Sequence, residues 1–128
     1  MNQKKLLWID DDEDLTLSCR PYLEKEGWQL ITASTAQQGK GVAVTEKPDL
    51  IIMDIIMEGE HGYKATQDIT NNPQLSDIPV IVFTSLTSRW SETTASQSDA
   101  LRSEADEFVD KSAGIDGLIS KIREYLST

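Results

Sequence analysis

The chain has 128 residues, of which 38% are hydrophobic and 27% charged, and this balance is typical of one folded domain and not of a disordered chain. Its 22 acidic residues against 12 basic ones give a net charge of −10, which disfavours direct binding to nucleic acid or to an anionic membrane. The apolar run at residues 6–9 is too short for a signal peptide or a membrane span, and the single Cys19 cannot form an internal disulfide, so we expect a cytoplasmic protein.

Two strand-and-helix units are predicted in the first 46 residues. The apolar run at residues 6–9 predicts a strand, and apolar positions at three-to-four spacing across residues 15–23 predict the helix after it. Residues 28–33 predict the second strand. A capping box at residues 34–37 begins a helix that extends to about Glu46 and is weakened by the glycines within it.

The third predicted strand, Leu50–Met53, is an uninterrupted apolar run. Such a run is typical of a central strand that is buried on both faces of a parallel sheet. Asp54 follows at the position where this strand stops. A loop at residues 59–62 and a helix over about residues 63–71 come next.

The last part of the chain predicts two more strands and two more helices. Residues 79–83 form the fourth predicted strand, and a helix of undetermined start ends near Ser103. Phe108 and Val109 predict a short fifth strand. Apolar residues from 115 to 126 recur at helical spacing and predict the final helix.

Five strand-and-helix units without repeats or linkers predict an α/β fold, a doubly wound five-stranded parallel sheet with helices on both faces. The apolar third strand favours a central position, as in strand order 2-1-3-4-5. Ligands bind such sheets beyond the carboxyl ends of the strands, where the strand order reverses. We interpret residues 1–128 as one domain, with no output domain in this chain.

Polar residues stand at the carboxyl ends of four predicted strands: Asp10 and Asp11, Asp54, Thr84, and Lys111. Three carboxylates that converge on one edge repel each other, so such a site is normally organised around a hard cation, for which Mg²⁺ is the natural candidate. A carboxylate in this setting can act as a nucleophile. Thr84 can donate a hydrogen bond to a phosphoryl oxygen, and Lys111 can neutralise another.

Each of these residues taken singly has an ordinary structural explanation. An acidic run after a strand is commonly a solvated loop or a helix N-terminus, and a lone Thr or Lys at a strand end carries little information. The coincidence of all of them at four strand ends is what favours a functional site.

The chain resembles the receiver domain of response regulators over nearly all of its length. The resemblance rests on four motifs: Ile9-Asp10-Asp11, the run from Pro48 to Asp54, the run from Pro79 to Ser85, and the run from Ala105 to Lys111. It implies a flavodoxin-like (βα)5 fold with strand order 2-1-3-4-5. It also implies a role in two-component phosphorelay signal transduction.

The resemblance implies that Asp54 accepts a phosphoryl group from a phosphohistidine on a sensor histidine kinase or phosphotransfer protein, giving 4-aspartylphosphate. The implied Mg²⁺ ligands are Asp10, Asp11, Asp54 and the backbone carbonyl of Ile56. Thr84 and Lys111 would contact the phosphoryl oxygens, and Phe108 would move inward with Thr84 as the switch. The domain would dock an output protein through its fourth helix, fifth strand and fifth helix, and would catalyse only its own phosphorylation and dephosphorylation.

Two departures from the family pattern bear on the site. Ser112 stands where the family usually has a proline after a cis bond, and a cis bond before serine would cost about 2.5 to 4 kcal/mol, which leaves the geometry of the Lys111 loop open. The segment between Thr84 and Lys111 is also longer than usual. A receiver-like interaction module that works without phosphorylation is therefore the alternative.

A second alternative comes from residues 12–16, which match the Asp-x-Asp-x-Thr motif of haloacid-dehalogenase-like phosphatases. That motif begins directly after a strand, whereas the first predicted strand ends at Ile9. The match is thus out of register, and we expect Asp54 to be the acceptor.

Overall fold

A computed structural model describes residues 3–54, 56–57, 60–84 and 105–126. Its main sheet has the strands β1 (Lys5–Ile9), β2 (Gln29–Ala33), β3 (Leu50–Met53), β6 (Val80–Thr84) and β7 (Glu107–Asp110). The described α-helices are α1 (Glu13–Lys25), α2 (Ala36–Glu46), α3 (Gly62–Thr70) and α5 (Gly114–Leu126). The predicted helix that ends near Ser103 lies outside the described residues.

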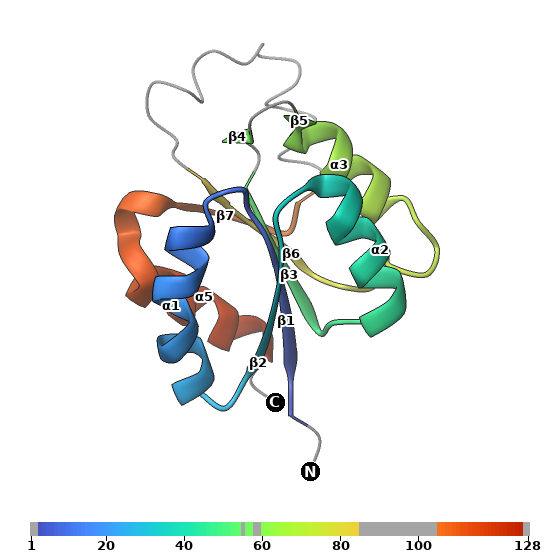
Figure 1. The fold of residues 1–128 in the computed structure, drawn as a ribbon. Coiled ribbons are helices and arrows are strands. Elements are labelled where there is room, and N and C mark those ends of the chain that lie inside the picture. The colour runs from blue at the N-terminus through green and yellow to red at the C-terminus, as the bar shows by residue number, and fades with distance from the viewer. Residues whose placement is uncertain (1–2, 55, 58–59, 85–104, 127–128) are drawn as a thin grey trace.

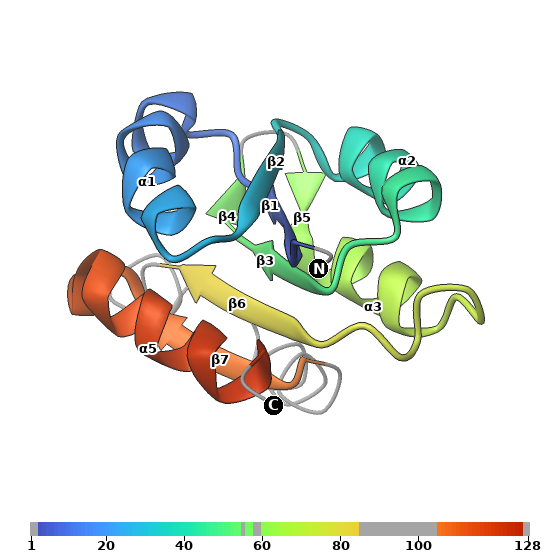
Figure 2. The same ribbon diagram turned by 90° about the horizontal axis from the view of Figure 1, so that it is seen from below.

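The sheet confirms the predicted topology. Its five strands are parallel and run in the order β2-β1-β3-β6-β7, which is 2-1-3-4-5 when the strands of this sheet are counted along the chain. Helices α1 and α5 cover one face, and α2 and α3 cover the other (Figures 1 and 2). The molecule is therefore a three-layer α/β structure with β3 at the centre of the sheet.

Alternation along the strands divides the core into two apolar clusters. In β1, Leu6 and Trp8 face the cluster that contains side chains of α1 and α5, whereas Leu7 and Ile9 face the one that contains side chains of α2 and α3. All four residues of β3 are buried, as expected for a central strand. Cys19 is buried in the first cluster and forms no disulfide.

The capping box of α2 lies one residue later than predicted. The N-cap is Thr35, whose Oγ1 accepts a hydrogen bond of 3.0 Å from the Gln38 amide. The Gln38 side chain reaches back and accepts one of 2.9 Å from the Ser34 amide. The prediction of a box at residues 34–37 was wrong because two adjacent hydroxyl residues can each serve as cap, and the extended backbone of Thr35 decides between them.

The segment after Asp54 also differs from the prediction. A two-residue strand β4 (Ile56–Met57) pairs antiparallel with β5 (Glu60–His61), and α3 follows directly at Gly62. The predicted loop at residues 59–62 thus contains β5 and the first residue of α3, and its partner strand β4 lies just before it. Two-residue strands are too short to show a hydrophobic period, which is why the sequence did not reveal them.

Gly39 allows α2 to approach β1 closely at the residue before the first acidic pair. A Cβ at Gly39 would overlap the side chain of Ile9, whereas a Cβ at Gly41 in the same helix would have no atom within 4 Å. We expect Gly39→Ala to destabilise the fold by about 1 to 3 kcal/mol through overpacking, while Gly41→Ala stabilises it by roughly 0.5 to 1 kcal/mol. Urea unfolding of both variants measures this, and equal effects of the two substitutions would contradict the proposed contact.

A buried hydroxyl in α3 gives a second stability prediction. Thr66 is fully buried and its Oγ1 has no hydrogen bond, whereas Thr16 in α1, which is 5% exposed, donates from Oγ1 to the Glu13 carbonyl at 3.1 Å. Replacement of an unsatisfied hydroxyl by a methyl group of the same shape removes its desolvation cost, so Thr66→Val should raise the free energy of unfolding by about 1 kcal/mol. Thr16→Val is the matched control and should give no gain in thermal denaturation; a gain of equal size there would argue against this explanation.

Candidate functional site

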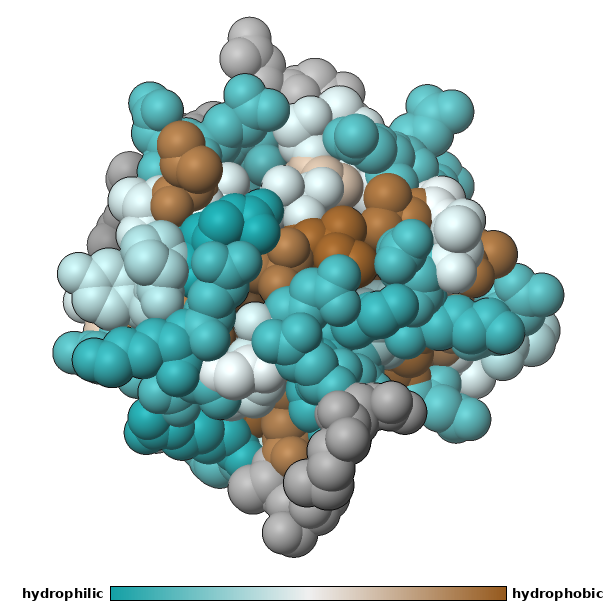
Figure 3. Space-filling model, turned by 60° about the horizontal axis from the view of Figure 1, so that its bottom comes forward, coloured by the Kyte–Doolittle hydropathy of each residue, from teal (hydrophilic) through white to brown (hydrophobic). Residues whose placement is uncertain are grey.

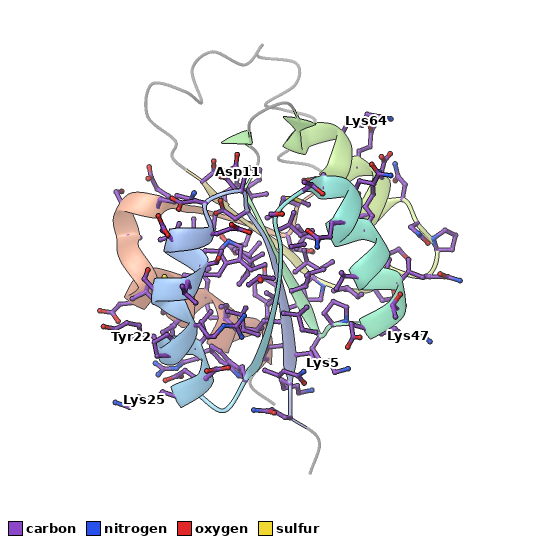
Figure 4. The ribbon with its side chains drawn as sticks, viewed as in Figure 1. Lys5, Asp11, Tyr22, Lys25, Lys47 and Lys64 are labelled. Atoms are coloured by element: carbon purple, nitrogen blue, oxygen red, sulfur yellow. The ribbon has the colours of Figure 1, made fainter. Side chains whose placement is uncertain are left out.

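The predicted site residues meet at one edge of the sheet because the strands are parallel. Asp10, Asp54 and Lys111 each directly follow a strand, and Thr84 is the last residue of β6. Ile9 lies beside Met53 in the register of β1 and β3, so the two aspartates that follow them emerge at the same level. Figure 4 shows Asp11 at this edge, in the connection between β1 and α1.

Three carboxylates form the centre of the site. One side-chain oxygen from each of Asp10, Asp11 and Asp54 lies within 4.8 Å of the other two. Asp10 and Asp54 are only 1% and 3% exposed, whereas Asp11 is exposed. Two ligand atoms therefore lie at the base of the site and one at its opening, an arrangement that can hold a hard cation reached from solvent.

Each oxygen of the Asp54 carboxylate accepts a hydrogen bond from a predicted site residue. The hydroxyl of Thr84, which is fully buried, donates to Oδ1 at 2.7 Å. The ammonium of Lys111 donates to Oδ2 at 3.2 Å. Residues from three different strand ends are thus held in direct contact, and the carboxylate is fixed in orientation by charge-assisted bonds.

Lys111 bridges the two buried carboxylates. Its Nζ lies 3.1 Å from Asp10 Oδ2 and 3.2 Å from Asp54 Oδ2. Burial by itself would lower the pKa of this ammonium, but attraction to Asp54 and Asp10 and the hydrogen bonds to them outweigh it and raise the pKa. Lys111 is therefore a permanent positive charge inside the acidic cluster at physiological pH.

The departure at Ser112 does not keep Lys111 out of the site. Residues 111–113 form a 3₁₀ turn, η2 (Lys111–Ala113), in which the Asp110 carboxylate accepts a hydrogen bond of 2.9 Å from the Ser112 amide. The described residues contain no cis peptide bond, so the bond between Lys111 and Ser112 is trans. A turn capped by Asp110 thus places the Lys111 ammonium against Asp54, although the chain lacks the usual proline after Lys111.

Asp10 has an unusually buried environment for a carboxylate. Its Oδ1 accepts a hydrogen bond of 2.9 Å from the Asp12 amide, and its Oδ2 faces both the Lys111 ammonium and the indole N–H of Trp8, at 3.3 Å. Desolvation by burial raises the pKa of Asp10 to about 6, with repulsion from Asp54 adding to it against the Asp12 hydrogen bond and the attraction of Lys111.

Trp8 is a residue of the site that the motifs did not predict. The signal that could have found it is the period of two along a strand, which puts Trp8 on the same face as Asp10. Its apolar neighbours in β1 had indicated a core residue. Trp8 is both a core residue and a site residue, since its ring is fully buried while its N–H contacts Asp10 in the acidic cluster.

Residues 6–123 match the response regulator receiver domain family. The chain belongs to this family. It is a receiver domain of the kind found in two-component response regulators, as the resemblance in its motifs predicted.

Individual relatives agree with this assignment. The receiver domain is 38% identical over 80 residues to Protein PilH of Pseudomonas aeruginosa, an alignment that covers 62% of this chain and 66% of that protein. It is 34% identical over 121 residues to the KDP operon transcriptional regulatory protein KdpE of Escherichia coli, covering 94% of this chain and 50% of KdpE. The chain thus spans between half and two thirds of the length of these two curated relatives.

Solved structures show the same fold. The response regulator protein TrrA of Thermotoga maritima, crystallised in complex with Mg(2+)-BeF, superposes with a TM-score of 0.81 at 27% identity, covering 97% of this receiver domain and 100% of that chain. The chemotaxis protein CheY4 of Vibrio cholerae gives a TM-score of 0.82 at 19% identity, covering 98% and 100% of the two chains. The doubly wound architecture described above is therefore that of known receiver domains.

The structure also describes the backbone of Ile56 and the side chain of Phe108, which the resemblance names. Ile56 is the first residue of β4, two residues after Asp54, and its carbonyl as a metal ligand stays a prediction. Phe108 lies half-buried in β7 and packs against the apolar cluster on the α2 and α3 face. Its inward movement with Thr84 likewise stays a prediction.

The phosphatase motif at residues 12–16 has a structural explanation in this receiver domain. The Asp12 side chain accepts a hydrogen bond of 3.0 Å from the Leu15 amide and is the N-cap of α1. Thr16 is buried and donates to the Glu13 carbonyl within the same helix. These residues begin a helix, whereas the carboxylates that meet at the strand ends are those of Asp10, Asp11 and Asp54.

Proposed function

We propose that this receiver domain accepts a phosphoryl group on Asp54 from a phosphohistidine of a sensor histidine kinase or a phosphotransfer protein, in the presence of Mg²⁺. The observation that carries this proposal is the set of contacts around Asp54. A buried carboxylate has a hydroxyl on one oxygen and an ammonium on the other, with two further carboxylates within reach. These are the parts that phosphoryl transfer needs for positioning and charge neutralisation.

The charge of the site fits a divalent cation. Three ionised carboxylates and one ammonium leave a formal charge of −2, and all three carboxylates offer the hard oxygen atoms that Mg²⁺ prefers. We infer that Asp10, Asp11 and Asp54 hold the ion together with the carbonyl of Ile56. When bound, Mg²⁺ would offset the repulsion between these carboxylates and the oxygens of the incoming phosphoryl group. That TrrA was crystallised with Mg(2+)-BeF supports this assignment.

The transfer step follows from the position of Asp54. A carboxylate oxygen attacks the phosphorus, and the bond between phosphorus and the histidine nitrogen breaks. That nitrogen keeps the electron pair and takes up one proton from solvent, which leaves a neutral imidazole. Thr84 and Lys111, which contact Asp54 in the unphosphorylated site, would then donate to the phosphoryl oxygens. The domain would catalyse this transfer and the later hydrolysis only on itself.

The proposed switch links the site to a docking surface. Thr84 would turn toward the phosphoryl group, and Phe108 in the neighbouring strand β7 would move inward. This would alter the face that includes β7, α5 and the predicted fourth helix, which lies outside the described residues, and an output protein would bind there. We propose that this occurs in the cytoplasm, in line with the short apolar run at residues 6–9 and the single Cys19.

The described surface does not single out another partner. Hydrophilic side chains cover most of the face in Figure 3, with apolar side chains gathered between them. Of the residues that the structure describes, the large exposed apolar ones belong to three helices: Leu17 and Tyr22 in α1, Val44 in α2, and Tyr125 in α5. Among the described residues, no helix combines the length and apolarity needed to span a bilayer.

Incubation with Mg²⁺ and a small acyl phosphate, followed by intact-mass measurement, tests the proposal. We expect one added phosphoryl group on the wild type and none on Asp54→Asn. Asp49→Asn is a matched control, because Asp49 flanks the other end of β3, where it accepts a hydrogen bond from the Lys5 amide. No addition to the wild type, or the same addition to Asp54→Asn, would overturn the assignment and favour an interaction module that works without phosphorylation.

A further inference from the structure

Trp8 links two strand ends of the site through a side chain that carries no charge. Its ring is fully buried and lies edge-on to Phe83, with the ring centroids 5.7 Å apart and an angle of 70° between the planes. Phe83 directly precedes Thr84 in β6, and Trp8 stands two residues before Asp10 in β1. The indole, which belongs to the strand before Asp10, therefore packs across the face of the sheet against the residue before Thr84, and this close packing limits its rotation.

The fixed ring aims a hydrogen-bond donor at the site. Trp8 Nε1 lies 3.3 Å from Asp10 Oδ2, a long but buried bond, and burial strengthens its electrostatic part. An indole N–H is a donor only, so it can orient a carboxylate without any change of its own charge. The period of two along β1 places both side chains on the same face, and the contact thus follows directly from the strand.

The three donors to Asp10 differ in what happens to them during phosphoryl transfer. The Asp12 amide belongs to the backbone at the start of α1 and holds Oδ1. Lys111 shares Oδ2 with Trp8, but it also contacts Asp54, and in the proposed reaction it turns toward the phosphoryl group. Trp8 is the side-chain donor to Oδ2 that stays in place, since the packing of its ring does not depend on the phosphoryl group.

A carboxylate has about four acceptor positions, and the donors described here use three of those on Asp10. Two donors contact Oδ2 and one contacts Oδ1, so the fourth position lies on Oδ1. Because a side-chain oxygen of Asp10 lies within 4.8 Å of oxygens of Asp11 and Asp54, we infer that this position would serve the ion or a water bound to it. Rotation of the carboxylate would exchange these positions. A donor that prevents rotation therefore keeps the free position directed at the ion site, in the manner of outer-sphere hydrogen bonds in metal sites generally.

We propose that Trp8 is a positioning residue for Mg²⁺ binding, whose indole N–H holds the Asp10 carboxylate in the orientation that the ion requires. This inference rests on the proposed function, because it assumes that the three carboxylates hold Mg²⁺.

The test compares Mg²⁺ affinity in Trp8→Phe and Trp28→Phe, from the shifts of backbone amide signals in NMR titrations. Phenylalanine keeps an aromatic ring against Phe83 but removes the N–H. Trp28 is 8% exposed and lies in the same apolar cluster, so its replacement is matched in kind. We expect Trp8→Phe to weaken Mg²⁺ binding by about tenfold, and Trp28→Phe to leave it unchanged. Equal affinity of Trp8→Phe and the wild type would overturn the inference.

Two further readouts separate positioning from a general loss of structure. The indole N–H signal of Trp8, assigned by its absence in Trp8→Phe, should shift on addition of Mg²⁺ and in Asp10→Asn, while that of Trp28 stays. In the Asp10→Asn background, Trp8→Phe should have no additional effect on Mg²⁺ affinity, because Trp8 acts through Asp10. An unmoved Trp8 signal, or additive losses of affinity, would show that Trp8 contributes only packing.

Failure of the inference and failure of the proposed function give different results. If the wild type binds Mg²⁺ and accepts a phosphoryl group on Asp54 while Trp8→Phe binds the ion equally well, the inference alone is overturned. If the wild type neither binds Mg²⁺ nor accepts the phosphoryl group, both are overturned.

Discussion

Lys111→Met is expected to destabilise the metal-free protein by roughly 3 kcal/mol at neutral pH, because it leaves two buried carboxylates without their shared counter-charge. Lys111 Nζ contacts Asp10 and Asp54, which are almost fully buried, and methionine has a similar volume. The loss is thus one of charge more than of packing. Urea unfolding in the presence of a chelator measures it.

The pH and the metal should both modify this loss. Near pH 4 the Asp10 carboxylate, whose pKa burial raises to about 6, is protonated and needs the ammonium less, so the difference between the variant and the wild type should shrink. Mg²⁺ should stabilise the variant more than the wild type, since it supplies the missing positive charge. The variant should nevertheless accept a phosphoryl group poorly, because its phosphoryl oxygens have lost a donor.

Lys121→Met is the matched control for this substitution. Lys121 also contacts two carboxylates, Glu107 and Glu124, but all three side chains are partly exposed to solvent, by 32% to 59%. Exposed ion pairs contribute little to stability, so this variant should unfold like the wild type. Equal destabilisation by both substitutions would show that Lys111 is not in a special environment.

Asp10→Asn should change how stability depends on pH in metal-free buffer. Burial raises the pKa of Asp10 in the folded state from its ordinary value of 3.8 to about 6. The folded protein therefore holds this proton more tightly than the unfolded chain does, and the group lowers stability as the pH rises from about 4 to above 6. A difference of about 2 pKa units corresponds to about 3 kcal/mol.

The asparagine variant lacks this pH-dependent contribution. Its free energy of unfolding relative to the wild type should thus increase by up to about 3 kcal/mol between pH 4 and pH 7.5. The cost of placing an amide beside Trp8 and Lys111 does not depend on pH, so it shifts the whole profile without changing its slope. Saturating Mg²⁺ should reduce or reverse the difference, because only the wild type gains a charged ligand. Parallel pH profiles for the two proteins would contradict the raised pKa, and ¹³C NMR titration of the Asp10 carboxyl group gives a direct check.

Much of the architecture was determined by local patterns. The uninterrupted apolar run at Leu50–Met53 indicated a central strand, and all four of its residues are buried in the middle of the sheet. The alternation of strands and helices indicated a parallel sheet, and parallel strands necessarily bring their carboxyl ends to one edge. This is why Asp10, Asp54, Thr84 and Lys111 could be grouped before any contact was known.

Other features escaped the sequence because they depend on contacts between distant residues. The choice of Thr35 as cap depends on the backbone that follows β2, and the β4–β5 pair is too short to have a period. From the sequence, Gly39 was expected only to weaken its helix. In the structure, its lack of a side chain makes room for Ile9 of β1, which lies thirty residues earlier in the chain. No pattern within α2 contains this information.

By itself, the sequence determined that an acidic chain of this size would fold as one α/β sheet with three carboxylates, a threonine and a lysine at its strand ends. Only the tertiary structure decided how these groups are paired. It showed that Lys111 reaches Asp10 and Asp54 from a turn without the usual proline, and that Trp8 donates to Asp10 from the core. The physical reason is that residue type and period fix which groups share an edge, whereas distances, burial and the resulting pKa depend on how layers far apart in the sequence pack together.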